Sequence, residues 1–200
     1  MVFGALGDIH GDFASVHAII GSEPDVPFWL AIGDLADESG RYEAVGSPIY
    51  WIKGNNENFD LIASGEFPAG LHYLANGSLT IIEGVRVCAL GGTFAPTVYE
   101  TAAVDLPHPR KRSARATALA DRRRHFVREE VEACRRAEGV DVLLTHEASW
   151  PYFVGRVPTK RTPINDVLAD ARPRLHLFGH HHKLTEQTRE GVRSVGLGLV

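Results

Sequence analysis

The hexapeptide Gly7-Asp8-Ile9-His10-Gly11-Asp12 follows an apolar opening of six residues, and we expect the rest of the chain to be arranged around it. Asp8 and His10 are two residues apart, so on an extended backbone their side chains would point the same way and could hold one divalent ion. The glycines on either side would allow a sharp turn. Taken alone, the hexapeptide is weak evidence, because His10 could equally be a solvated loop residue.

Four later segments repeat this pattern of an apolar run, a small residue and a residue of a metal-ligand type. They are residues 27–32 with Gly33-Asp34, residues 48–52 with Gly54-Asn55, residues 140–144 with Thr145-His146, and residues 174–178 with Gly179-His180-His181-His182. Such apolar runs are typical of strands covered on both faces, and in open α/β sheets ligands bind beyond the carboxyl ends of the strands. We therefore expect five strands to end at one edge and to gather the candidate metal ligands Asp8, His10, Asp34, Asn55, His146, His180 and His182.

Length and composition predict a single globular domain over residues 1–200, and the strand ends described above suit an α/β fold. The formal net charge of −4 argues against a polyanion as a partner of the whole surface. Cys88 and Cys134 are expected to be buried free thiols in a reducing compartment. We find neither a secretory leader nor an apolar run of membrane-spanning length, so we expect a cytoplasmic protein that does not associate with membranes. No obligatory protein partner is evident.

Two aspartates near the candidate ligands have ordinary alternatives. Asp12 either caps a helix over residues 13–20, which Gly21 would stop, or supports the metals from behind, and capping is the usual role of an Asp in that place. Asp37 is either a residue that supports the metal ligands or a solvated loop residue.

Turn signals occupy the middle of the chain. The run Asn55-Asn56-Glu57-Asn58 would by itself be read as a polar turn that caps the next helix, but Asn55 holds the position that Asp34 holds after its own strand. Asn76-Gly77 and Glu83-Gly84 are hairpin signals between apolar runs, and they predict a second, partly antiparallel sheet.

Residues 104–139 are rich in arginine, and a long helix is predicted from about Ser113. We favour a solvated helix surface here over a basic ridge that steers nucleic acid or a polyphosphate toward the metals. The basic residues are Arg110, Lys111, Arg112, Arg115, Arg122, Arg123, Arg124, Arg128, Arg135 and Arg136.

The candidate ligands are too many for one ion of ordinary coordination, but they suit two ions that share a carboxylate. Mixed oxygen and nitrogen donors without thiolate favour two divalent transition-metal ions, manganese first, with iron or zinc as the alternatives. Two such ions can hold a hydroxide between them and neutralise the oxygens of a phosphoryl group as it is attacked in line. The cluster therefore predicts phosphoester hydrolysis.

The five motifs together resemble those of the calcineurin-like metallophosphoesterases, in order and over most of the chain. The matching motifs are Asp8-x-His10-Gly11, Gly33-Asp34-x-x-Asp37, Gly54-Asn55-x-Glu57, Thr145-His146 and Gly179-His180-x-His182. The resemblance implies a four-layer αββα sandwich of two mixed sheets flanked by helices. It also implies that Asp8, His10 and His182 hold one metal, that Asn55, His146 and His180 hold the other, and that Asp34 bridges the two.

One position departs from the family pattern. The third motif of the commoner members continues with a histidine that is thought to protonate the leaving group or bind the phosphate, whereas this chain has Asn56 there, whose amide cannot transfer a proton at neutral pH. Family branches that lack this histidine are often phosphodiesterases, so a phosphodiesterase is the leading expectation. Asp34, Asn56 and His146 are the catalytic candidates. Asp12, Asp37, Glu57 and His108 are candidates for support or substrate binding, with His108 as the nearest spare acid or simply a solvated turn residue.

Several alternatives stay open. The segment from Asn55 to Gly92 also resembles the lariat-debranching branch of the superfamily, which would imply a nucleic-acid substrate, but a small nucleotide diester explains the motifs equally well. Within the same fold, a phosphomonoesterase or protein phosphatase is the second expectation. A non-catalytic scaffold is the third, and the complete ligand set argues against it.

Overall fold

The computed structural model describes residues 2–106, 121–151, 153–154, 157–158 and 160–200. Its strands are β1 (Gly4–Leu6), β2 (Trp29–Ala31), β3 (Ile49–Trp51), β4 (Leu71–Tyr73), β5 (Leu79–Ile82), β6 (Val85–Leu90), β7 (Val142–Thr145), β8 (Phe153–Val154), β9 (Val157–Pro158), β10 (Leu175–Phe178), β11 (Thr185–Arg189) and β12 (Val192–Gly196). Its helices are α1 (Phe13–Ser22), α2 (Phe59–Ser64), α3 (Arg128–Arg135) and α4 (Ile164–Ala171), with short 3₁₀ turns η1 (Ala103–Asp105) and η3 (Arg122–Arg124).

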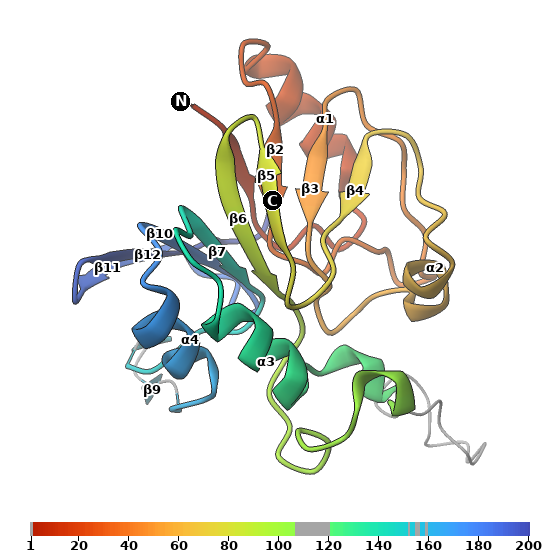
Figure 1. The fold of residues 1–200 in the computed structure, drawn as a ribbon. Coiled ribbons are helices and arrows are strands. Elements are labelled where there is room, and N and C mark those ends of the chain that lie inside the picture. The colour runs from red at the N-terminus through yellow and green to blue at the C-terminus, as the bar shows by residue number, and fades with distance from the viewer. Residues whose placement is uncertain (1, 107–120, 152, 155–156, 159) are drawn as a thin grey trace.

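Two sheets form the centre of the molecule (Figure 1). The first is parallel, with the strand order β1-β2-β3-β4, and the second is mixed, with the order β11-β12-β10-β7-β6-β5. Strands β8 and β9 form a small separate hairpin. The predicted runs were thus correctly identified as strands, but β1, β2 and β3 lie in one sheet and β7 and β10 in the other, so the expectation of one common sheet edge is wrong.

The burial pattern explains why these strands read as continuous apolar runs. Leu30 of β2 packs between the two sheets with Leu144 of β7 and Leu177 of β10. Its neighbours Trp29 and Ala31 point the other way, into a second core that includes Phe13 and Val16 of α1. Helices α3 and α4 cover the outer face of the second sheet through a third core. The central strands of both sheets are therefore buried on both faces, and the expected αββα sandwich is confirmed, except that the first sheet is parallel and not mixed.

Three local predictions can be compared with the structure, and two of them are wrong. Gly21 does not stop α1, because the helix continues to Ser22 and a single glycine is tolerated near a helix end. Asn76-Gly77 does not form a hairpin, because β4 and β5 belong to different sheets, and the turn carries the chain from one sheet to the other. Glu83-Gly84 does join β5 to the antiparallel β6, as expected.

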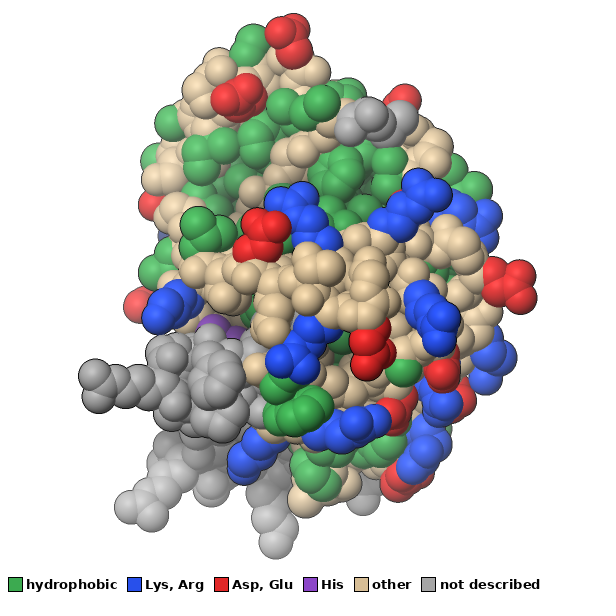
Figure 2. Space-filling model, turned by 90° about the vertical axis from the view of Figure 1, so that its left-hand side faces the viewer, with side chains coloured by type: hydrophobic (Ala, Val, Ile, Leu, Met, Phe, Trp, Pro, Cys, Tyr) green, Lys and Arg blue, Asp and Glu red, His purple; other side chains and the backbone are tan. Residues whose placement is uncertain are grey.

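The arginine-rich segment is also less helical than predicted. The expected helix start at Ser113 lies outside the described residues, residues 122–124 form only a 3₁₀ turn, and α3 begins at Arg128. Three of the described arginines of this segment pair with carboxylates: Arg123 with Asp121 and Asp60, Arg128 with Glu100, and Arg135 with Glu132 and Asp170. On the face shown in Figure 2, Lys and Arg side chains lie interspersed with Asp and Glu.

Two further observations concern the whole chain. Cys88 and Cys134 are buried free thiols, as expected, and Cys134 Sγ donates to the Ala89 carbonyl at 3.4 Å. In the described part of the chain, every helix is too short or too polar to cross a membrane.

Candidate metal centre

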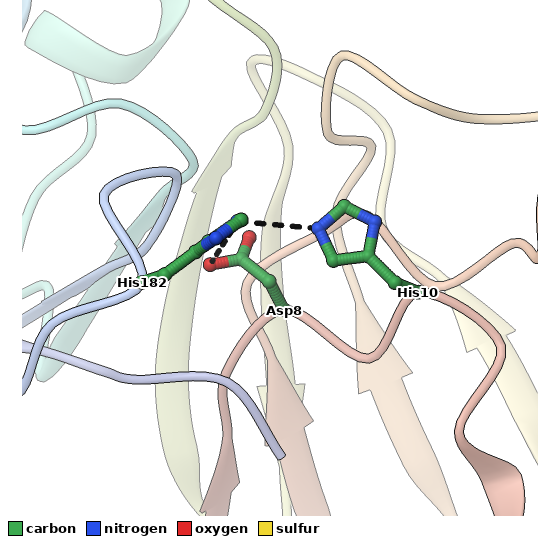
Figure 3. Close-up of side chains that lie close together, drawn as sticks. All are labelled: Asp8, His10 and His182. Carbon is green, nitrogen blue, oxygen red and sulfur yellow. Dashed lines mark hydrogen bonds and ion pairs between the residues drawn. The ribbon is translucent and has the colours of Figure 1, made fainter.

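The carboxyl ends of β1, β2 and β3 in the first sheet lie beside those of β7 and β10 in the second sheet, and the candidate ligands converge there. His10 Nε2 lies 3.2 Å from His182 Nε2, and His182 Nε2 lies 3.8 Å from Asp8 Oδ2 (Figure 3). Asp8 comes from the loop after β1, and its carboxylate accepts the backbone N–H of His180, in the loop after β10, at 3.0 Å. This hydrogen bond ties the end of the first sheet to the end of the second.

A second group shares Asp8 and extends the cluster. His146 Nδ1 lies 3.6 Å from Asp8 Oδ1, and His146 Nε2 lies 3.6 Å from Asp34 Oδ2. Asn55 Oδ1 is 2.9 Å from His146 Nε2. Asp34 Oδ2 is also 3.7 Å from His10 Nε2, so Asp34 stands between the two groups. The His180 ring packs beside the His146 ring, with 5.0 Å between their centroids.

The backbone at the cluster is strained. Among the described residues, seven other than glycine have a positive φ, and four of these are candidate ligands: His10 (47°), Asp34 (54°), His180 (67°) and His182 (51°). Side chains with a Cβ seldom adopt this region, and such residues concentrate at functional sites. The expected convergence is observed, but the proposed reason is wrong: tight turns after the strands, rather than alternation along an extended chain, bring the side chains together.

Two glycines allow the loops to approach one another. A Cβ on Gly33 would lie 2.5 Å from the backbone nitrogen of Gly54, and a Cβ on Gly54 would lie 2.0 Å from Asp34 Oδ1. The loops after β2 and β3 therefore touch where Asp34 and Asn55 must meet. Only residues without a side chain permit this contact.

Burial dominates the electrostatics of the cluster. Asp8, Asp34 and His146 are each no more than 1 % exposed. Burial, followed by the nearby charge of Asp34, raises the pKa of Asp8 to about 8. Burial opposes ionisation of Asp34 as well, but the adjacent His146 and the hydrogen bonds from Asn56 outweigh it and lower the pKa of Asp34. Burial lowers the pKa of His146 to about 4, so its imidazole is neutral at pH 7.

This donor set fits metal ions. His146 Nδ1 lies 2.8 Å from the Ile32 carbonyl, and a proton on Nδ1 that donates there leaves the lone pair of Nε2 facing the oxygens of Asn55 and Asp34. A neutral imidazole lone pair that faces two oxygens is repelled by them unless a cation lies between. The side chains of Asp8, His10 and His182 form one candidate ligand group, and those of Asp8, Asp34 and His146 form another.

Asn56 and Glu57 hold the ligands in place. Asn56 donates to both oxygens of Asp34, from its backbone N–H at 2.7 Å and from Nδ2 at 2.8 Å. Glu57 accepts the backbone N–H groups of Leu35 and Gly54, at 3.1 Å each, and so links the loops after β2 and β3. Burial raises the pKa of Glu57 to about 7.

The other supporting candidates have ordinary local roles or are not described. Asp12 caps α1 by accepting the backbone N–H of Ser15 at 3.0 Å. Asp37 accepts from Ser39 and Arg41 within its own loop, which favours the loop alternative. His108 lies outside the described residues.

Sequence reasoning missed one residue at the rim of the cluster. Arg124 is 9 % exposed, and its Nη2 donates to the Asn55 carbonyl at 2.7 Å. In the sequence Arg124 was one of ten basic residues between residues 104 and 139, and nothing in that run distinguished it from its neighbours. Its burial in the fold is what distinguishes Arg124 from the other described basic residues of this run.

The fold and the cluster together define a protein of the metallophosphoesterase class. The family model described as calcineurin-like phosphoesterase matches residues 1–184, and the chain belongs to that family. No curated protein matches the chain.

Two solved structures show the same fold. TT1561 of Thermus thermophilus is 15 % identical, with a TM-score of 0.62 over 97 % of this chain and 87 % of that one. GAP50, described as the anchor in the inner membrane complex of Plasmodium, is 12 % identical, with a TM-score of 0.50 over 98 % of this chain and 70 % of that one.

Proposed function

We propose that the protein is a dimetal phosphodiesterase. The observation that carries the proposal is the buried group Asp8, Asp34 and His146, in which two carboxylates and a neutral imidazole face one another. Burying two carboxylates side by side is costly unless cations accompany them. Two divalent ions bound here would supply Lewis acidity to activate water and to neutralise a phosphoryl group. Manganese is the first choice, because the donors mix oxygen with imidazole and include no thiolate.

The chain's own residues would divide the work as follows. Asp8, His10 and His182 would hold one ion, Asn55, His146 and His180 the other, and Asp34 both. The Ile32 carbonyl fixes the tautomer of His146, and Asn56 fixes the orientation of Asp34. The catalytic roles of Asp34 and His146 are thus those of ligands.

Asn56 supports the preference for diesters. Its amide is engaged with the Asp34 carboxylate and has no transferable proton at neutral pH. A monoester with an alkoxide leaving group depends strongly on a general acid, whereas an activated diester depends on one less. We favour a small phosphodiester over nucleic acid, because three of the six arginines that the structure describes in this segment, Arg123, Arg128 and Arg135, pair with carboxylates.

The test combines metal analysis with two substrates. We expect about two transition-metal ions per chain and faster cleavage of bis(4-nitrophenyl) phosphate than of 4-nitrophenyl phosphate. Asn56→His is expected to raise the monoester kcat/KM about tenfold relative to the diester. Asn56→Ala is the matched control, because it also removes the side-chain bond to Asp34 but adds no acid. A wild-type preference for the monoester would contradict the argument from Asn56.

A non-catalytic scaffold is the candidate from outside the enzymes, because GAP50 has the same fold and is described as an anchor. A scaffold has no need of buried carboxylates that face an imidazole, so the cluster favours the enzyme. A wild-type protein that binds metal but cleaves neither substrate would support the scaffold instead.

A further inference from the structure

A groove lies on the outer face of the second sheet, between α4 and the β11–β12 hairpin, which are next to each other in Figure 1. Its floor includes Val192 and Ser194, which point to the same side of β12, and Leu168 of α4 forms part of its wall. The cavity has a volume of about 590 Å³, which is within the usual range for small-molecule sites. The described residues that line it include none of the candidate metal ligands, so the groove is separate from the metal centre.

Ser194 belongs to a buried row of hydrogen bonds that crosses three strands. His176 of β10 is the register partner of Ser194, and His176 Nδ1 lies 3.1 Å from Ser194 Oγ. The other ring nitrogen, Nε2, lies 2.8 Å from Thr145 Oγ1 of β7. The Thr145 hydroxyl in turn donates to the Glu147 carbonyl at 2.8 Å.

The direction of these hydrogen bonds follows from the groups themselves. A carbonyl only accepts, so Thr145 uses its one proton for Glu147 and must accept from His176 Nε2. Burial lowers the pKa of His176 to about 3, so the ring is neutral and its single proton is on Nε2. Nδ1 therefore accepts the proton of the Ser194 hydroxyl. The Ser194 oxygen can then only accept further hydrogen bonds, and a ligand in the groove must present a donor to it.

The groove also carries a positive charge. Among its described lining residues three are basic and one is acidic: Arg161, Arg172, Arg189 and Glu190. Arg161 pairs with Asp166 at 3.1 Å. Arg172 donates to a backbone carbonyl of its own helix, and Arg189 lies beside the neutral amide of Gln187. In the described part of the chain, neither of these two guanidinium groups lies within ion-pair distance of a carboxylate.

The two arginines without a carboxylate partner lie at the same end of the groove. Arg189 is paired with Val192 at the start of β12, and Arg172 is the C-terminal cap of α4. The Arg174 carbonyl accepts the Arg193 N–H at 3.3 Å, so the end of α4 and the start of β12 lie together. Guanidinium groups bind phosphate oxygens well because their N–H donors match phosphate geometry. This end of the groove is therefore suited to a phosphate group.

The other end of the groove is aromatic. Asn165, in the first turn of α4, accepts the Trp150 N–H at 3.3 Å and donates to the Trp150 carbonyl at 2.7 Å. Trp150 lines the groove and is 46 % exposed, so its ring is accessible for stacking. The helix rises by about 10 Å between Asn165 and Arg172. The length of the groove thus suits a ligand with an aromatic group, a middle part with a hydrogen-bond donor, and an anionic end.

We propose that this groove is a second ligand site, and that it binds a nucleoside monophosphate. The base stacks on Trp150, a ribose hydroxyl donates to Ser194, and the phosphate lies between Arg172 and Arg189. This inference goes beyond the proposed phosphodiesterase function and does not depend on it, because the residues that carry it are not candidate metal ligands.

The first test measures which parts of the ligand are recognised. Adenosine 5′-monophosphate is the probe, and isothermal titration calorimetry of the full chain gives its dissociation constant with manganese and again in chelator. We expect one nucleotide per chain and the same affinity in both conditions. Adenosine, which lacks the phosphate, and ribose 5-phosphate, which lacks the base, should each bind at least about tenfold more weakly. Trp150 fluorescence should be quenched by the nucleotide, because Trp29 and Trp51 are buried.

The second test changes the basic end. Arg172→Gln and Arg189→Gln should each raise the dissociation constant for the nucleotide about tenfold. Arg174→Gln is the matched control and should bind as the wild type does, because Arg174 is an exposed arginine that does not line the groove and pairs with Asp141 at 3.8 Å.

The third test examines Ser194 with the ligand as well as the protein. The wild type should bind 2′,3′-dideoxyadenosine 5′-monophosphate about threefold to tenfold more weakly than the parent nucleotide, because no ribose hydroxyl is left to donate. Ser194→Ala should bind the two nucleotides with affinities within about twofold of each other. Equal affinities of the wild type for both would overturn the role of Ser194.

Three results would overturn the site as a whole. They are a wild type that does not bind the nucleotide, affinities of both Arg172→Gln and Arg189→Gln within about twofold of wild type, and adenosine that binds as tightly as its monophosphate. Binding that disappears in chelator but survives in both arginine variants would place the nucleotide at the metal centre and would also overturn the proposal. A chain that binds the nucleotide in the groove but has neither metal nor esterase activity would contradict only the proposed function.

Discussion

At the scale of single residues, the features that gather the candidate ligands make the fold less stable. Asp8 and Asp34 are buried near each other, and His10, Asp34, His180 and His182 hold strained backbone conformations. Neither feature stabilises the fold, and both bring donor atoms into one small volume. Substitution of a ligand should therefore affect metal-free and metal-loaded protein in opposite directions.

The substitution Asp8→Asn tests this expectation of opposite effects on metal-free and metal-loaded protein. The folded pKa of Asp8 is about 8, above its ordinary value, so folded protein retains a proton that unfolded protein releases, and stability falls as pH rises from about 4 to about 8. Without metal, the wild type should be less stable at pH 8 than at pH 6 by up to about 3 kcal/mol, at about 1.4 kcal/mol per pH unit. Asp8→Asn should lose the larger part of this dependence, which comes from Asp8, and keep the smaller part from Glu57, whose pKa is raised to about 7.

Urea unfolding in chelator at both pH values measures the effect. Repeating the titrations with saturating manganese provides the control, because the variant should lose most of the stabilisation that the metal gives the wild type. An identical pH slope in the two metal-free proteins would show that Asp8 titrates normally.

At the scale of elements, the loops after the strands decide the site. Gly33 and Gly54 allow the loops after β2 and β3 to touch, and Glu57 bonds to backbone groups of both. The strands position the loops, and the contacts between loops position the ligands. The 3₁₀ turn η3 adds the Arg124 side chain to the same rim.

Gly54→Ala should therefore damage metal binding. The added Cβ would lie 2.0 Å from Asp34 Oδ1, so the carboxylate or the loop must move. We expect a loss of manganese affinity of about tenfold or more, in the range seen when residues that orient ligands are changed. Gly46→Ala is the matched control, because a Cβ added there would have no atom within 4 Å and the φ of Gly46 is not positive. Calorimetric manganese titrations of both variants distinguish the outcomes, and equal affinities would contradict the close-contact argument.

At the scale of the whole molecule, the two sheets share a core. Leu30 and Ile32 of the first sheet region pack with Val87 and Leu144 of the second, so neither sheet has a complete core by itself. The hydrogen bond from His180 to Asp8 joins the sheets again at the metal site. Their relative position therefore sets the spacing of the ligands.

The shared core predicts that the protein unfolds as one unit. Trp29 and Trp51 are buried in the first sheet, whereas the third tryptophan, Trp150, is 46 % exposed. The change in tryptophan fluorescence on unfolding therefore reports mainly on the first sheet, and far-UV circular dichroism reports on both sheets. In urea without metal, the two signals should give the same midpoint. Two separated midpoints would mean that the sheets unfold independently, and that the expectation of a single domain over residues 1–200 is wrong.

The amino-acid sequence by itself determined the strands, the ligand types and their order along the chain. Apolar runs and the residues after them are local features, and five motifs in order, from Asp8 to His182, identified the family. Gly21 and Asn76-Gly77 were misread because propensity alone does not specify which helix or sheet a segment joins.

Only the tertiary structure decided how the ligands meet and which arginine lies beside them. The division of the strands between two sheets, the contact of Gly33 with Gly54, and the burial of Lys53 and Arg124 all depend on packing between segments distant in sequence. Burial and long-range contact are properties of the assembled core. For that reason, the ten basic residues could not be distinguished from one another in the sequence. Only the fold shows that Lys53 donates hydrogen bonds to the backbone carbonyls of Arg123 and His125, on both sides of Arg124.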